Sequence, residues 1–203
     1  MRRTITGAAL CCLVSALLTG CSGSPRVTYY SLETATKTGV TKTANKEMPV
    51  VSVYTTTFPE LVDRPQIVER LDSNRIEILE FHRWAEPLKS AVPRILADNL
   101  SRLLESDRVF SYPQNAGSDA DYRVFVDFQR FESEGNAVSV EALWKINRTT
   151  NGGQKSGRVR IREVTGGEGF EAVIAAYNRA LTSLSSDIAQ ALRAEFNSAA
   201  GQK

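Results

Sequence analysis

The chain is organised around residues 81–104, whose sequence is FHRWAEPLKSAVPRILADNLSRLL. Its second part repeats apolar residues every three or four positions, which places them on one face of a helix: Leu88, Ala91, Val92, Ile95, Leu96, Leu100, Leu103 and Leu104. Pro87 suits the first helical position, because its missing N–H is not needed there. Pro93 either kinks this helix or marks where its regular part begins.

A second amphipathic helix follows near the end of the chain and begins close to Gly169. Its apolar stripe runs for about six turns and comprises Phe170, Val173, Ile174, Tyr177, Ala180, Leu181, Leu184, Ile188, Ala191 and Leu192. Both helices therefore have one face to bury.

Strands are predicted for most of the remaining chain. The clearest is residues 138–146, where alternate positions are apolar, a period of two. With residues 122–131 and 158–164 it predicts an antiparallel meander, and Asp72-Ser73-Asn74 predicts the turn of a hairpin. Shorter strands are predicted at residues 28–32, 50–57 and 108–112. One-sided helices and strands predict an α+β fold: a two-layer sandwich whose mostly antiparallel sheet carries two amphipathic helices on one face.

The N-terminus has the pattern of a lipoprotein signal. Arg2 and Arg3 precede an apolar run, and Leu18-Thr19-Gly20-Cys21 resembles a bacterial lipobox. The alternative is an ordinary secretory signal with an unrelated cysteine. We predict a signal peptide at residues 1–20, a lipidated tether at 21–27, a single domain at 28–197 and a flexible tail at 198–203. The lipobox implies lipidation of Cys21 with diacylglycerol and an N-acyl chain such as palmitate.

The charge balance and the cysteine content argue against nucleic-acid binding and against sites that need a thiol. The chain has 25 basic and 23 acidic side chains, and removal of residues 1–20 takes away two arginines and no acid. The balanced mature protein is not expected to bind nucleic acid. Cys11 and Cys12 leave with the signal, so the mature domain has no free thiol for a disulfide, a metal or a nucleophile.

Catalytic patterns are weak in this chain. His82 is the only histidine; Ser90 and Glu86 are near, but no G-x-S-x-G elbow is present. Two carboxylate pairs, Glu77 with Glu80 and Glu132 with Glu134, could serve glycoside hydrolysis, but nothing in the sequence places them in a cleft. We expect no enzyme activity, no metal and no cofactor beyond the covalent lipid.

Arginines line one face of the predicted strand at residues 158–164, namely Arg158, Arg160 and Arg162. A solvated or edge-protecting face is the favoured interpretation. A site for lipid headgroups or a partner protein is the alternative.

Several segments together resemble a known family. They are the lipobox, Tyr29-Tyr30-Ser31-Leu32, the strand at 50–53, His82-Arg83-Trp84-Ala85-Glu86-Pro87-Leu88, Leu96-Ala97-Asp98-Asn99-Leu100, Tyr122-Arg123-Val124 and the closing helix. The chain resembles the PqiC-type (YmbA) auxiliary lipoproteins of ABC-type transport systems. The resemblance implies that it is a subunit of a transporter associated with membrane integrity. The resemblance covers nearly all of the mature chain, and Trp-Ala-Glu-Pro-Leu is its most specific part.

The resemblance implies a role beside a mammalian-cell-entry (MCE) protein and an inner-membrane component that move lipids between the two membranes. It supplies no catalytic residues, and it makes Trp84 and Glu86 structural or interfacial. Ser22 follows the lipidated cysteine where Asp would favour inner-membrane retention, which points to the outer membrane, facing the periplasm.

The main hypothesis is therefore an outer-membrane-anchored periplasmic auxiliary lipoprotein of an MCE-type lipid transport system that contributes to envelope integrity. Its candidate partner interface comprises Trp84, Glu86, Arg158, Arg160 and Arg162, and a homo-oligomer is plausible. The alternatives are a stand-alone periplasmic lipid-binding carrier, with a pocket between helices and sheet, and a hydrolase using His82.

Overall fold

The computed structural model describes residues 25–34, 48–150 and 152–200. The predicted signal peptide and Cys21 lie outside these residues. The elements, in chain order, are β1 (Thr28–Tyr30), β2 (Val51–Thr57), β3 (Gln66–Arg70), β4 (Ile76–Trp84), α2 (Leu88–Leu103), β5 (Val109–Ser111), the 3₁₀ turn η1 (Asn115–Gly117), β6 (Tyr122–Glu134), β7 (Ala137–Arg148), β8 (Gln154–Val164) and α3 (Phe170–Ala200).

The sheet is built around β6, and one edge of that strand pairs with two different strands in succession. β7 pairs with β6 from Glu134↔Ala137 to Tyr122↔Arg148, and β8 pairs with β7 over almost the same length. The other edge of β6 pairs first with β2 and then, at Ser133 and Glu134, with β3. β2 continues to β5, while β3 continues to β4 and β1.

The prediction of a mostly antiparallel sheet is wrong, because the sheet is mixed. Four of its seven strand pairings are parallel: β1 with β4, β2 with β5, β2 with β6 and β3 with β6. The predicted meander β6–β7–β8 and the predicted hairpin β3–β4 are confirmed. Strands adjacent in sequence turn back on one another, whereas the parallel pairs join strands far apart in the chain.

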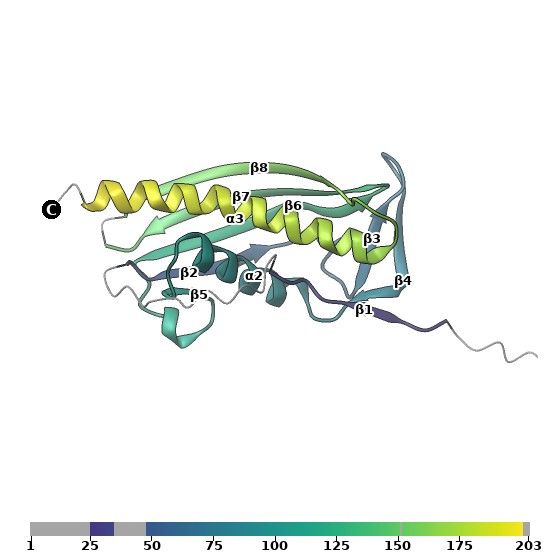
Figure 1. The fold of residues 1–203 in the computed structure, drawn as a ribbon, viewed down its shortest axis with the longest axis horizontal. Helices are drawn as coiled ribbons and strands as arrows, with labels where there is room; N and C mark the ends of the chain where they lie inside the picture. The colour runs from purple at the N-terminus through teal and green to yellow at the C-terminus, as the bar shows by residue number, and fades with distance from the viewer. Residues whose placement is uncertain (1–24, 35–47, 151, 201–203) are drawn as a thin grey trace, which may run out of the picture.

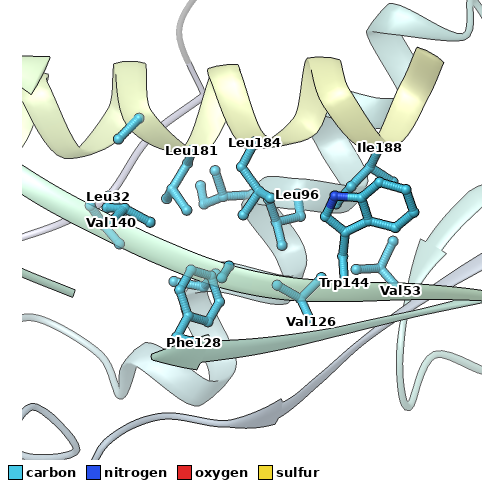
Figure 2. Close-up of a cluster of buried hydrophobic side chains, with 14 of the residues drawn as sticks. Leu32, Val53, Leu96, Val126, Phe128, Val140, Trp144, Leu181, Leu184 and Ile188 are labelled. Carbon is cyan, nitrogen blue, oxygen red and sulfur yellow. The ribbon is translucent and has the colours of Figure 1, made fainter. Parts of the chain in front are cut away.

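Both helices cover one face of the sheet, as predicted (Figure 1). α2 packs on β2 and β5, and α3 packs on β7 and β8 and against α2. Figure 2 shows the core between these layers: side chains of α3 meet inward side chains of β6 and β7, labelled as Leu181, Leu184, Ile188, Val126, Phe128, Val140 and Trp144. Of the described helices, neither α2 nor α3 covers the opposite face, on which the 3₁₀ turn η1 packs beside Ser52 and Phe110.

The two helices differ slightly from their predicted ends. Pro87 precedes α2 with φ −58° and ψ 135°, so the helix begins at Leu88 and not at the proline. Pro93 lies buried inside α2, which continues on both sides of it. α3 extends to Ala200, three residues past the predicted domain boundary, so residues 198–200 are helical. Among the described helices, none combines the length and hydropathy that a membrane span requires.

Candidate functional site

Trp84 ends β4 and points into the core. Only 7% of the residue is exposed, and its ring packs edge-on against Tyr177 of α3, with 5.5 Å between ring centroids. The centroid of Phe131 lies 6.3 Å away. Parallel pairing of Tyr30 with Trp84 on β1 and β4 holds this backbone in place. Trp84 is therefore mainly a core residue.

Glu86 lies just outside this core, at the rim of a pocket of about 420 Å³ between the β4–α2 junction and the preceding loop. The carboxylate pairs with Arg94 of α2, and a second rim pair joins Lys89 Nζ to Asp63 Oδ2 at 2.5 Å. Apolar and charged residues both line the pocket: Asp63, Arg64, Pro65, Trp84, Ala85, Glu86, Pro87 and Leu88. The pocket thus combines charged residues at its rim with the buried apolar side chains of Trp84 and Leu88.

The arginines of β8 lie on the other side of the sheet from Trp84. Arg158, Arg160 and Arg162 are exposed and alternate with residues directed under α3. Arg160 Nε pairs with Glu141 Oε1 of β7 at 3.0 Å, whereas Arg158 and Arg162 form no ion pair with any described residue. The predicted interface residues therefore belong to two separate surfaces.

An aromatic row crosses the same face, opposite α2 and α3, and the sequence patterns do not predict it. Tyr112 stacks on Tyr54 with ring centroids 4.4 Å apart, and Tyr54 stacks on Phe125 at 5.1 Å. Lys145 Nζ lies 5.7 Å from the Phe125 centroid, which is cation–π geometry. Strand pairing aligns Tyr54 with Phe125 and Phe125 with Lys145. No local pattern reveals this row, because β2, β6 and the end of β5 are far apart in sequence.

A hollow of about 470 Å³ lies beside this row. Its lining includes the cations Lys145 and Arg158 and the carboxylate of Asp127. The apolar side chains of Leu143 and Phe125 also line it. Such a surface suits a protein segment that presents apolar side chains together with acidic groups. We call the outer face of β6–β8, with Tyr54 and Tyr112, the open sheet face.

His82 takes part in a structural stack. Its Nδ1 lies 2.9 Å from the Tyr30 hydroxyl, and its ring stacks on Phe170 with centroids 3.8 Å apart. Burial, and to a lesser extent the charge of Glu171, raise the pKa of Tyr30 above its ordinary value. The stack joins β1 and β4 to the first residue of α3. Within the described ranges, no group of three or more His, Cys, Asp or Glu side chains is placed to hold a metal.

Three of the four proposed carboxylates are engaged by basic or amide groups, whereas Glu77 is exposed on β4. Glu132, whose side chain is 4% exposed, accepts hydrogen bonds from Arg70 Nε at 2.8 Å and Arg70 Nη2 at 2.9 Å and also pairs with Arg130. Burial by itself raises the pKa of Glu132, but the hydrogen bonds from Arg70 and Arg130 outweigh it, so the pKa lies below its ordinary value. Glu134 pairs with Arg130 at 3.2 Å, and Glu80 accepts from Gln66 at 3.2 Å.

Comparison with known proteins gives the family. The model of the ABC-type transport auxiliary lipoprotein component matches residues 30–189. The crystal structure of an uncharacterized protein matches with a TM-score of 0.65 and 18% identity, covering 83% of this chain and 99% of the other. Protein XCC0632 from Xanthomonas campestris, of family DUF330, matches with a TM-score of 0.53 and 20% identity, covering 79% and 92%.

At these identities the two structures show the fold alone. No curated protein matches the sequence. The family match spans most of the chain and confirms the resemblance to PqiC/YmbA-type proteins. This chain belongs to the family of ABC-type transport auxiliary lipoprotein components.

Proposed function

We propose that this lipoprotein is a non-enzymatic docking subunit of an MCE-type intermembrane lipid transport system, anchored in the outer membrane and facing the periplasm. Family membership supports an auxiliary role in transport. The observation that carries docking is the open sheet face, where an aromatic row and exposed arginines lie on the side of the sheet that α2 and α3 do not cover.

Anchorage gives such a docking subunit a physical advantage. Lipid chains on Cys21 would hold the domain at one membrane, and more than one chain is needed for a stable anchor. A tethered domain meets a partner arriving from the inner membrane at a raised effective concentration. Modest contacts then suffice for a lasting assembly that contributes to envelope integrity.

The open sheet face has the composition of an interface. Aromatic residues and arginine are enriched at protein interfaces, because they combine a large apolar contact area with hydrogen bonding. Here Tyr54, Tyr112 and Phe125 supply the apolar area, and Arg158 and Arg162 supply exposed cations that form no ion pair within the described part of the chain. An MCE-domain protein with an acidic and apolar contact surface would complement it. A homo-oligomer could present several such faces at once.

The stand-alone carrier is the weaker alternative, because it needs an apolar cavity between the helices and the sheet. In the part of the chain that the structure describes, side chains of both layers fill that space. Leu181, Leu184, Ile188, Leu96 and Val126 are all fully buried there. The two pockets described above are open hollows at other places.

Pull-down of the full-length lipidated chain from envelopes tests the proposal. We expect the MCE protein to co-purify with the wild type, and Arg158→Glu combined with Arg162→Glu to reduce its recovery. Glu86→Arg tests in the same way the pocket beside the β4–α2 junction, where Glu86 lies at the rim. Ala194→Glu, at an exposed position of α3, is the control that should bind normally.

Deletion of the protein should also weaken the envelope, measured as sensitivity to detergents. Normal detergent resistance after deletion, together with no recovery of an MCE protein by the wild type, would refute the proposal. Specific loss of binding in Glu86→Arg alone would move the docking site to the β4–α2 junction. Equal binding by all variants would exclude both the open sheet face and the β4–α2 junction as the docking site.

A further inference from the structure

Large apolar side chains are exposed at a few places on this domain, and most of them lie near one end. Five such residues have between 43% and 62% of their surface exposed: Tyr29, Leu71, Phe81, Tyr112 and Val164. Soluble domains rarely gather such residues without a use for them. Four of the five belong to the end that carries β1, β3 and β4 (Figure 1).

Strand pairing places Tyr29 beside Phe81. Tyr29 lies opposite Arg83 in the parallel pairing of β1 with β4. Phe81 precedes Arg83 by two residues, so it shares the same side of β4. The intervening His82 and the neighbouring Tyr30 point the other way and stack toward Phe170. Tyr29 and Phe81 are thus exposed together.

Strand pairing also places Leu71 and Val164 at this end. Arg70 pairs with Glu134, Glu134 with Ala137, and Ala137 with Val164, which forms one row across β3, β6, β7 and β8. Leu71 follows Arg70 directly, in the β3–β4 turn. The C-terminal end of α3 and the strand β5 lie toward the opposite end of the molecule (Figure 1), and Tyr112 directly follows β5.

The chain to the lipid anchor leaves from the same end. Cys21 precedes Thr28, the first residue of β1, by seven positions. At roughly 3.3–3.6 Å per residue, this tether reaches only about 25 Å. The 31 residues of α3 extend about 46 Å toward the other end of the domain. An anchor on Cys21 therefore keeps the β1 end close to the lipid surface and leaves the far end free.

We infer that Tyr29, Leu71, Phe81 and Val164 form a membrane-contact surface, on which the anchored domain rests against the bilayer. This inference relies on lipidation of Cys21, which is part of the proposed function, but not on the identity of the transport partner. Tyr and Phe suit the boundary between water and acyl chains. Because the anchor makes the contact intramolecular, a few side chains are enough to orient the domain.

Two ion pairs lie beside this surface. Arg75 pairs with Asp72 at 2.6 Å beside Leu71, and Arg83 pairs with Glu80 at 3.5 Å beside Phe81. Because the contact is made by apolar side chains, it should persist at high salt, which screens exposed charges. Val164 lies at the edge of the open sheet face, and the rest of that face, which includes Tyr112, would remain accessible to a periplasmic partner.

Single-cysteine labelling tests this inference cleanly, because the lipidated chain has no other free thiol. Leu71→Cys, Phe81→Cys and the control Tyr112→Cys are each labelled with a fluorophore in the full lipidated protein. The protein is reconstituted in vesicles of phosphatidylethanolamine and phosphatidylglycerol. Quenching by brominated lipid and by aqueous iodide is then measured for each position, after flotation has separated bound from free protein.

We expect brominated lipid to quench the labels at 71 and 81 several-fold more than the label at 112, and iodide to show the reverse order. Flotation with equal quenching at all three positions overturns the contact surface but leaves the anchor intact. Protection from iodide without quenching by lipid would indicate that a second copy of the protein covers these positions, and it overturns the inference as well. Loss of flotation overturns the anchor and, with it, the orientation.

Discussion

The indole Nε1 of Trp144 donates a hydrogen bond to Asp187 Oδ2 over 2.7 Å, which joins β7 to α3 beneath the helix. Trp144 is buried, and its ring lies in the core shown in Figure 2. A buried N–H must find an acceptor, because leaving it unpaired is costly. This contact therefore helps to hold α3 in its place on the sheet.

Asp187→Ala should destabilise the protein by about 1–3 kcal/mol, because it leaves the indole N–H of Trp144 without its acceptor. Asp187→Asn keeps a carbonyl acceptor and should lose less. Urea unfolding followed by circular dichroism measures both. Equal losses in the two variants would show that the side chain of Asp187 stabilises α3 in some other way.

Gly157→Ala should also destabilise the protein, because the space for a side chain is already taken by Trp144. A Cβ atom at Gly157 would lie 2.4 Å from Cζ2 of the indole. Forcing an extra methyl group into a packed core costs about 1–3 kcal/mol. The same urea measurement applies, with Ser156→Ala on the exposed side of β8 as the matched control.

The clash should be relieved when the indole is made smaller. In a double-mutant cycle, Gly157→Ala should cost less in a Trp144→Phe background than in the wild type. Additive losses would mean that the β8 backbone, and not the ring of Trp144, resists the substitution.

Glu132 should make the protein sensitive to acid. Its hydrogen bonds from Arg70 and Arg130 lower its pKa in the folded protein below the ordinary value of 4.5. Its contribution to stability is therefore complete above about pH 4.5 and is lost as the pH falls through the folded pKa. Stability measured from pH 7 to pH 3 should decline more steeply in the wild type than in Glu132→Gln.

At neutral pH, Glu132→Gln itself should cost about 3–5 kcal/mol, since it leaves two arginines without their buried partner. Glu134→Gln is the control, because the side chain of Glu134 is 39% exposed and exposed ion pairs contribute little. Parallel pH profiles for wild type and Glu132→Gln would assign the acid sensitivity to other groups.

Trp84→Ala should cost about 3–5 kcal/mol of folding free energy through lost core packing. The side chain is almost fully buried against Tyr177 and Phe131, which explains the expected size of the loss. Thermal unfolding together with the MCE pull-down separates the two roles. A variant with wild-type stability that fails to bind would instead make Trp84 an interface residue.

Local patterns predicted the elements well, because each depends on neighbours in sequence. The alternation from Val138 to Ile146 predicted β7, and the stripe from Phe170 to Leu192 predicted α3. The same alternation put Arg158, Arg160 and Arg162 on one exposed face.

Long-range pairings could not be predicted in this way. Nothing in residues 51–57 indicates that β2 lies parallel to β6, with Tyr54 against Phe125. Glu132 gives no sequence sign of burial, because one of its arginine partners, Arg70, comes from β3 and is 62 residues away in the chain. The stack of His82 on Phe170 likewise depends on elements about ninety residues apart. These contacts define the candidate surfaces, so the surfaces emerged only from the structure.

Photo-crosslinking in intact envelopes is the most direct test of docking through the open sheet face. A benzoylphenylalanine residue at position 158 on the open sheet face is compared with one at position 194 on the exposed side of α3. We expect a covalent adduct with the MCE-domain protein from position 158 and none from position 194. Absence of an MCE adduct from position 158, with the lipidated protein present at its normal level, would contradict it.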